Sequence, residues 1–313
     1  MISTEKEALE DIFLRCDRFL FGHGLQRPRA VLADLAEEAG ADEEPDRYGQ
    51  GSLISDFERD IAVLLGKEAA VFLPSGTMAQ QIALRIWSEH KRTDLHATPG
   101  PLAALLLELP QREIGGQLPS WSELEAQTTW AHDQGAAVHM DGARLWESGP
   151  FYARSYAEIA GLFDSAYVSF YKGIGAIAGA ALTGPAAFIA EARLWQRRHG
   201  GNLVQLYPFV LSARANLRRR LEKFGAYSQR ALAVARVLCS IPGISVKPDP
   251  PQTNMMHVYL RCDAEALMEA CAEIAQTERV LLFRRLIPTG VPGVAADQEI
   301  GAFFEHLMAQ AGA

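Results

Sequence analysis

Short apolar segments alternate with longer segments of helical periodicity along the central part of the chain. The apolar segments have the length of buried strands and cover residues 69–74, 102–110, 136–141, 165–172 and 178–184. Amphipathic helices are predicted before and between them, at residues 53–68, 80–90 and 120–135. Because buried strands that alternate with helices form mainly parallel sheets, the pattern predicts an α/β fold with such a sheet.

The two ends of the chain follow a different pattern. Further helices are predicted at residues 3–20, 27–40, 207–238 and 262–277, and extended segments within residues 242–260. We therefore expect a large α/β domain of residues 27–238. Residues 1–26 and 239–313 are expected to form a smaller α+β domain.

Composition limits the classes of partner. Apolar residues make up 49% of the 313 residues and charged residues 22%, which is ordinary for a folded protein and unlike a disordered one. The formal net charge of −8 gives no attraction to nucleic acid or to an anionic membrane, and no apolar run could span a bilayer. Cys16, Cys239, Cys262 and Cys271 are too scattered for a zinc site. We expect a cytoplasmic protein with no metal, nucleic acid or membrane partner.

Lys172 stands at the end of an apolar segment and before several glycines, which let a bulky group approach the backbone. A desolvated lysine has a lowered pKa and becomes a nucleophile at neutral pH, so this position suits covalent binding of an aldehyde cofactor. The alternative is a solvated lysine at a strand end, the commoner situation for this residue type.

Asp141 ends the strand predicted at residues 136–141, where open α/β sheets bind ligands, and Arg144 lies three positions on. A carboxylate there could hold the ring nitrogen of pyridoxal 5′-phosphate (PLP) protonated, and the planar fork of Arg144 suits a substrate carboxylate. The alternatives are an Asp141 that caps the following turn and an Arg144 in a surface salt bridge.

Ser75, Gly76 and Thr77 lie between a predicted strand and a predicted helix. Backbone N–H groups and hydroxyls meet there at the positive end of the helix, which is a suitable cradle for a phosphate. The alternative is a plain helix N-cap.

Five segments together resemble the low-specificity threonine aldolases and related β-eliminating lyases. They read LLGKEAAVFLPSGTMAQQIAL, HMDGARLWES, VSFYKGIGAIAGA, WQRRHGGNL and PPQTNMMHVYL, and the similarity extends from about Tyr48 to Gly293. The resemblance implies a PLP-dependent transferase-like fold (fold type I). It also implies a PLP-dependent lyase that cleaves a threonine-like β-hydroxy-α-amino acid to glycine and an aldehyde.

The resemblance implies roles for single residues. Lys172 would hold PLP covalently, and Asp141 would bind the pyridine nitrogen. The other implied binding residues are Ser75, Gly76 and Thr77 at the phosphate, Arg144 at the pyridine or carboxylate side, and Arg285 at the substrate carboxylate. Because the family forms homodimers or homotetramers with active sites at subunit contacts, Tyr48, Gly49 and residues 197–201 are expected to serve a neighbouring subunit.

The chain departs from the family pattern in three places. The segment that carries a histidine stacked on the PLP ring is absent near residues 91–94, and neither His90 nor His96 stands in its context. The chain is also short near residues 292–296, and residues 21–24 lack the usual Ser/Thr stretch. Either the protein is naturally truncated there, or residues are missing from the sequence, in which case the backbone should be broken at the first two places.

Two other functions remain open. Residues 173–179 fit a loose GxGxxxG spacing, which would indicate an NAD-dependent oxidoreductase if a helix followed the glycines. A PLP-fold homologue that has lost catalysis together with the ring-stacking segment is the second alternative.

Overall fold

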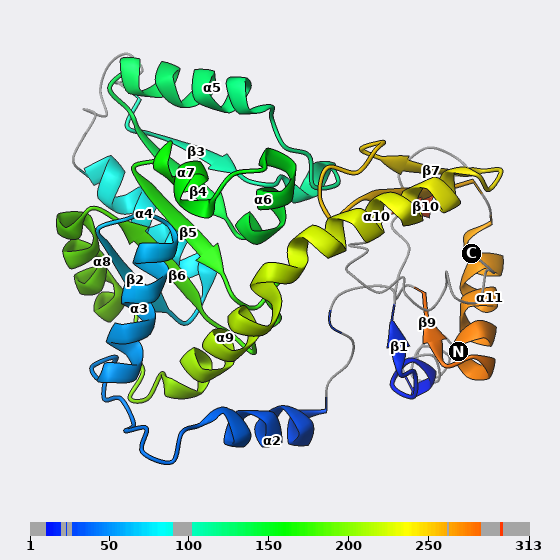
Figure 1. Cartoon of the computed structure of the whole chain (residues 1–313), viewed down its shortest axis with the longest axis horizontal. Helices are drawn as coiled ribbons and strands as arrows, with labels where there is room; N and C mark the ends of the chain where they lie inside the picture. Colours follow the sequence, from blue (N-terminus) through cyan, green and yellow to red (C-terminus); the bar gives the residue numbers. More distant parts are fainter. Residues whose placement is uncertain are drawn as a thin grey trace. The chain divides into compact units, whose positions relative to one another are not determined.

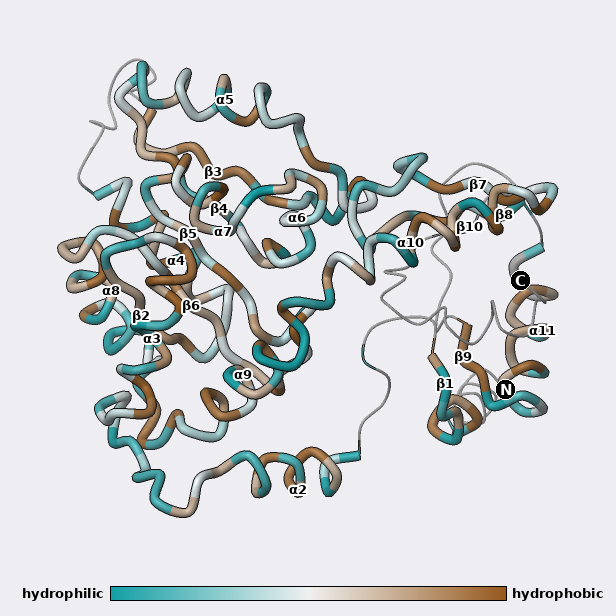
Figure 2. Tube along the Cα trace, in the orientation of Figure 1, coloured by the Kyte–Doolittle hydropathy of each residue, from teal (hydrophilic) through white to brown (hydrophobic). Residues whose placement is uncertain are grey.

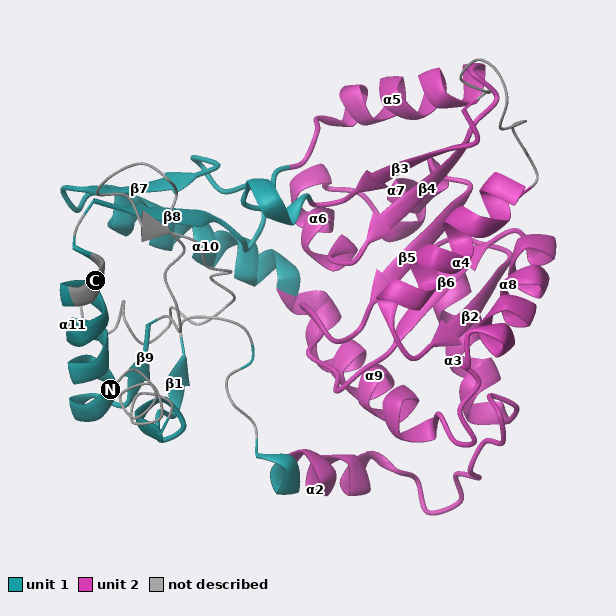
Figure 3. Ribbon diagram, turned by 180° about the vertical axis from the view of Figure 1, so that it is seen from behind, with its two compact units in different colours: residues 1–30, 111–117, 224–313 teal, residues 31–110, 118–223 magenta. Residues whose placement is uncertain are grey.

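The computed structural model describes residues 11–19, 23, 27–89, 102–261, 263–282 and 295–296. Contacts divide the chain into two compact units, coloured separately in Figure 3. Unit 1 comprises residues 1–30, 111–117 and 224–313, and unit 2 comprises residues 31–110 and 118–223. The domains predicted from the sequence, divided at residues 27 and 238, have other bounds and stay a prediction.

Unit 2 is built on a five-stranded sheet (Figure 1). Its strands, in spatial order, are β2 (Ala69–Leu73), β6 (Ala180–Gly184), β5 (Ser165–Ser169), β4 (Ala137–Gly142) and β3 (Ala104–Glu108). β3, β4 and β5 are parallel, whereas β6 is antiparallel to both of its neighbours, so four of the five strands point the same way. This confirms the mainly parallel sheet and the α/β fold that the apolar segments predict.

Helices cover both faces of this sheet. The helices of unit 2 and its border are α2 (Pro28–Glu38), α3 (Ser52–Leu64), α4 (Gly76–Glu89), α5 (Trp121–Asp133), α6 (Leu145–Tyr152), α7 (Tyr156–Gly161), α8 (Ala186–Arg198) and α9 (Tyr207–Arg220). On one face, Val71 and Leu73 of β2 share a core with α4 and α8. Because side chains alternate along a strand, Phe72 points to the other face, where its ring contacts Phe57 of α3.

The core strands carry few polar residues. β5 and β6 are buried along their whole length. The apolar residues of β2 and β3 can be followed in brown in Figure 2. No helix in the described part of the chain is long and apolar enough to cross a membrane.

Unit 1 combines helices with short strands. Its described elements are η1 (Arg112–Ile114), α10 (Phe224–Cys239), α11 (Ala264–Thr277) and the strands β1 (Arg18–Phe19), β7 (Ile244–Lys247), β8 (His257–Leu260), β9 (Val280–Leu281) and β10 (Ala295–Ala296). β10, β8 and β7 form an antiparallel sheet, and β1 pairs with β9 in parallel.

Two helix predictions are wrong in part. The helix predicted to reach residue 20 ends earlier, because Arg18 and Phe19 pair with Val280 and Leu281 as strand β1. The long helix predicted at residues 207–238 is divided into α9 and α10 by the 3-10 helix η2 (Leu221–Lys223). Several predictions lie outside the described residues: Arg285, His90 and His96, the chain break near residues 91–94, the break near residues 292–296 except for residues 295–296, and most of residues 21–24.

The dinucleotide interpretation of residues 173–179 is wrong. These residues form a turn between β5 and β6, and no helix follows the glycines. β5 and β6 pair antiparallel through this turn. A Rossmann fingerprint requires a helix whose N-terminus meets the pyrophosphate, and this segment leads into a strand instead.

Candidate active site

Three side chains form a row across the sheet where β3, β4 and β5 end. Glu108 pairs with Asp141, and Asp141 pairs with Tyr167. Residues directly opposite one another on neighbouring strands project to the same face. Tyr167 belongs to the core that contains α4, so Asp141 and Glu108 lie on the α4 face as well.

Asp141 is held in place by the turn that follows it. Its Oδ1 accepts the backbone N–H of Ala143 at 3.0 Å, and its carbonyl oxygen accepts that of Leu109 at 2.9 Å. The turn-capping alternative is therefore correct as a local description. The same bond also fixes the carboxylate at the edge of the sheet, where its negative charge acts on Tyr167 and Lys172.

Gly76 and Thr77 begin α4, and Ser75 precedes it in the turn after β2. Ser75 Oγ accepts the N–H of Met78 at 3.3 Å, so the N-cap alternative is also correct locally. The first N–H groups of any helix lack partners within that helix and can bind an anion. A Cβ added to Gly76 would lie 1.9 Å from the hydroxyl oxygen of Tyr167, so only glycine permits this approach.

Tyr167 lies between Gly76 at the start of α4 and Asp141 on β4. Its ring is 3% exposed, and its Oη lies 3.3 Å from Oη of Tyr171. Burial, followed by Tyr171 and Asp141, raises the pKa of the Tyr167 phenol, which stays neutral. The sequence analysis missed Tyr167. The available signal was its position two residues before the end of β5, the strand that pairs with the strand of Asp141.

Lys172 lies three residues beyond β5 and is half-buried, so it is not a fully solvated lysine. Burial and then the positive charge of Arg144 lower the pKa of its amine. The groups that act in the opposite direction are Tyr171, Asp141 and Glu108. Lys172 therefore lies within electrostatic reach of Asp141 and Arg144. Their roles in a shared site stay a prediction.

Arg144 is only 6% exposed, which excludes the alternative of a surface salt bridge. Glu147, in the first turn of α6, is 4% exposed. Burial raises the pKa of its carboxyl to about 8, although Arg144 and Lys172 both act to lower it. The sequence analysis missed Glu147 because a glutamate three residues after an arginine usually lies on a helix surface.

A chain of hydrogen bonds connects α4 to the strands β4 and β5. Trp87 Nε1 donates to Ser165 Oγ at 2.8 Å, and Ser165 Oγ lies 2.8 Å from His139 Nδ1. His139 Nε2 lies 2.9 Å from Gln80 Oε1. Because Gln80 Oε1 can only accept, the ring carries its proton on Nε2 and accepts the Ser165 hydroxyl at Nδ1. Burial lowers the pKa of His139 to about 4, so the ring is neutral.

A pocket of about 820 Å³ lies elsewhere in unit 2. Its lining includes Tyr48, Gly49 and Arg197, and neither Lys172 nor Asp141. Tyr48 has a left-handed φ of 54° and is 50% exposed. The loop is held by the buried Asp46, whose carboxylate accepts the N–H groups of Gly49, Leu206 and Tyr207. The structure thus brings together residues from both segments predicted to serve a neighbouring subunit.

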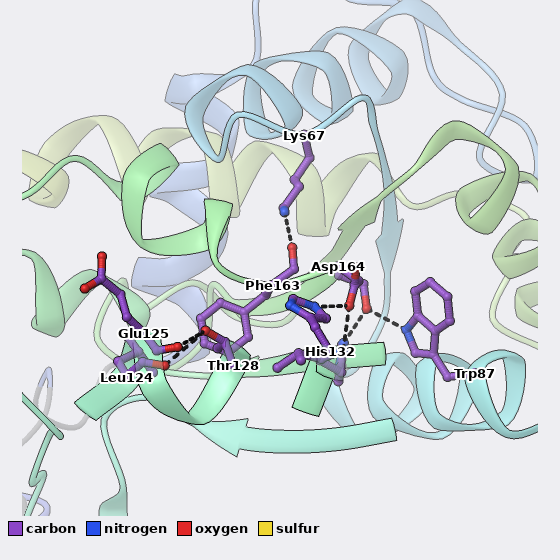
Figure 4. Close-up of polar contacts among 11 residues, drawn as sticks. Lys67, Trp87, Leu124, Glu125, Thr128, His132, Phe163 and Asp164 are labelled. Carbon is purple, nitrogen blue, oxygen red and sulfur yellow. Dashed lines mark hydrogen bonds and ion pairs between the residues drawn. The ribbon is translucent and has the colours of Figure 1, made fainter. Parts of the chain in front are cut away.

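The polar contacts at the opposite ends of β4 and β5 have a structural role (Figure 4). Asp164 Oδ2 accepts the N–H of Val138 at 2.6 Å and lies 3.0 Å from His132 Nε2. Lys67 Nζ donates to the carbonyl of Phe163. These bonds fix the turn before β5 and share no residue with the row that contains Asp141. Among the described residues, no group of three or more His, Cys, Asp or Glu side chains could hold a metal ion.

Comparison with known proteins finds one family over most of the chain. The profile of the beta-eliminating lyase family matches residues 29–98 and 89–262. A crystal structure of a candidate L-allo-threonine aldolase from Listeria monocytogenes EGD-E is 37% identical, covers 96% of this chain and 95% of its own, and superposes with a TM-score of 0.88. A candidate aromatic amino acid beta-eliminating lyase/threonine aldolase from Exiguobacterium sp. 255-15 is 35% identical over 97% of both chains, also with a TM-score of 0.88. Low-specificity L-threonine aldolase 1 of Arabidopsis thaliana is 23% identical over 82% of this chain and 85% of its own length.

Proposed function

Because the chain belongs to the beta-eliminating lyase family, we propose that it is a PLP-dependent lyase that cleaves a threonine-like β-hydroxy-α-amino acid to glycine and an aldehyde. The observation that carries the proposal is that Asp141 and the start of α4 meet at Tyr167, while Lys172 lies within electrostatic reach of Asp141 and Arg144. The names of the relatives favour a β-hydroxy amino acid as substrate.

The residues present fit PLP on two observations. Lys172 is half-buried with a lowered amine pKa, and lowering the pKa increases the fraction of free amine that can attack an aldehyde. Gly76 lies so close to the Tyr167 hydroxyl that no side chain fits, which fixes the start of α4, whose first N–H groups can bind a phosphate, beside β5. When bound, PLP supplies an electron sink for the bond that breaks at the substrate α-carbon.

Asp141 and Lys172 have distinct tasks in this proposal. Asp141, oriented by the Ala143 N–H, holds a proton on the pyridine nitrogen of the cofactor. Lys172 would hold the cofactor covalently through its side-chain amine. Ser75, Gly76 and Thr77 bind the phosphate through backbone N–H groups and hydroxyls.

Arg144 and Arg285 are proposed to bind the substrate carboxylate. The buried guanidinium of Arg144 lies within electrostatic reach of Lys172, and its planar fork matches a carboxylate. Arg285 lies outside the described residues and is assigned by the family resemblance alone. Tyr48, Gly49 and Arg197, which line one pocket, would complete the site of a neighbouring copy in a homodimer or homotetramer.

Product analysis tests the proposal. The protein is incubated with PLP and with L-threonine, L-allo-threonine or a 3-arylserine, and glycine and the aldehyde are measured in parallel. Equal amounts of the two products are expected, with no turnover by the Lys172→Ala variant. Release of ammonia and a keto acid without glycine would show β-elimination instead of aldol cleavage. A wild-type protein that binds PLP but releases neither set of products would support the inactive homologue.

A further inference from the structure

Glu147 is a buried carboxyl that no step of the proposed reaction uses. It stands in the first turn of α6 and is 4% exposed. Its Oε2 is buried and has no hydrogen-bond partner among the described residues. A buried polar atom without a partner costs free energy, so its retention at this point requires an explanation.

The carboxyl lies against the backbone that carries Lys172. A Cβ added to Gly173 would lie 2.2 Å from Glu147 Oε1 and 2.9 Å from its carboxyl carbon, so the glycine lets the carboxyl pack directly on the main chain. Gly173 follows Lys172 at the start of a turn, in which the Lys172 carbonyl accepts the N–H of Gly175 at 2.8 Å. Glu147 therefore forms part of the support for this turn.

Three ionisable groups interact with Glu147. Arg144, whose carbonyl accepts the Glu147 N–H at 3.0 Å, and Lys172 both favour the carboxylate. Tyr156 of α7 is the third, and the charge of Glu147 contributes to the raised pKa of its phenol. Burial opposes the two cations and prevails, so the carboxyl keeps its proton up to about pH 8.

We propose that Glu147 is a positioning residue for Lys172, a buried acid that supports the Lys172–Gly173 turn and whose charge is coupled to that of the lysine amine. A cation at Lys172 favours loss of the Glu147 proton, and the resulting carboxylate in turn favours the charged amine. The inference adds a residue to the proposed lyase site and rests on that proposal for its role in catalysis. The coupling itself depends only on the positions of the Glu147 and Lys172 side chains, and not on the reaction.

The apo-protein tests the coupling without any turnover. Reductive methylation of Lys172 with labelled formaldehyde is followed by NMR as the pH is raised from 6 to 10, in wild type and in Glu147→Gln. The amide keeps the shape of the side chain but cannot ionise. We expect similar reactivity below about pH 7 and roughly threefold faster modification of Lys172 in Glu147→Gln above about pH 8, because the amine there loses a stabilising carboxylate.

A matched control makes the same change at an exposed helical position. Glu125→Gln on α5 should leave the reactivity of Lys172 unchanged at every pH. The infrared C=O band of a protonated carboxyl should be present in wild type at pH 7, disappear as the pH rises past about 8, and be missing from Glu147→Gln. Among the described residues Glu147 is the carboxyl whose pKa is raised, so a wild-type band that disappears near pH 8 is assigned to it even if Glu147→Gln fails to fold. Equal Lys172 reactivity in the two proteins, or a carboxyl already ionised at pH 6, overturns the inference while leaving the lyase proposal intact.

Discussion

Gly76 lies against the hydroxyl of Tyr167, so closely that a Cβ on the glycine would be 1.9 Å from the phenol oxygen and 2.3 Å from the ring carbon that carries it. The first residue of α4 is thereby fixed beside the strands β4 and β5, in which Asp141 pairs with Tyr167. The contact joins the proposed phosphate cradle to the proposed ring-nitrogen carboxylate through one buried, neutral side chain.

Gly76→Ala should weaken PLP binding roughly tenfold or more, equivalent to about 1.4 kcal/mol. The added methyl must displace Tyr167 or the start of α4, and overpacking of this kind also destabilises a fold by about 1–3 kcal/mol. Absorbance titration with PLP and urea unfolding measure the two effects. Gly161→Ala is the matched control, since nothing lies within 4 Å of a Cβ at Gly161. Equal losses in the two variants would mean that the Tyr167 contact is unimportant.

Asp141→Asn should retain part of the PLP but lose activity by roughly 100-fold or more, because a neutral amide cannot hold a proton on the pyridine nitrogen. The amide oxygen can still accept the Ala143 N–H, so the turn should survive. Steady-state kinetics and the PLP content of the purified variant measure the two quantities. Activity within a few-fold of wild type would remove Asp141 from this role.

The neutral His139 should make the protein sensitive to mild acid. Burial lowers its pKa to about 4, below the value of about 6.5 for an unfolded histidine. Between these pH values the unfolded chain binds a proton that the folded protein does not, so the free energy of unfolding falls as the pH falls. The loss for this one group should reach roughly 3 kcal/mol at about pH 4.

Urea unfolding from pH 7 to pH 4 measures this loss. His139→Gln should lower stability at pH 7, since it disturbs the hydrogen bonds to Ser165 and Gln80, but it should flatten the dependence on pH. His132→Gln, at a half-exposed position on α5, is the control and should keep the wild-type slope. A wild-type slope in His139→Gln would assign the acid sensitivity to other groups.

The sequence predicts the sheet well because its signal is local. All five strands of unit 2 are apolar runs, and the candidate residues Ser75, Asp141 and Lys172 could be found because each stands at the end of such a run or just after it. Strand β1 could not be predicted, because Arg18 and Phe19 adopt it only by pairing with Val280 and Leu281, far away in the sequence. The break at η2 interrupts a helical pattern that continues through it, so periodicity gave no warning.

The remaining site residues depend on tertiary packing. In the sequence, Tyr167 looks like an ordinary strand residue. Only the strand register, which places it beside Asp141, and the close approach of Gly76 identify it as part of the site. Glu147 has the appearance of a surface residue until the fold buries α6 on the turn after Lys172. Burial, not residue type, gives both side chains their shifted pKa values.

The attachment of PLP to Lys172 is the central claim, and borohydride reduction followed by peptide mapping tests it most directly. Reduction fixes PLP to the lysine that holds it, and Lys67 provides an internal competitor because it is also partly buried with a pKa lowered by burial. The wild-type protein should carry the label on the peptide that contains Lys172, and Lys172→Ala should carry none. Label on Lys67 or on any other lysine in the wild-type protein, with the Lys172 peptide unmodified, would contradict the account.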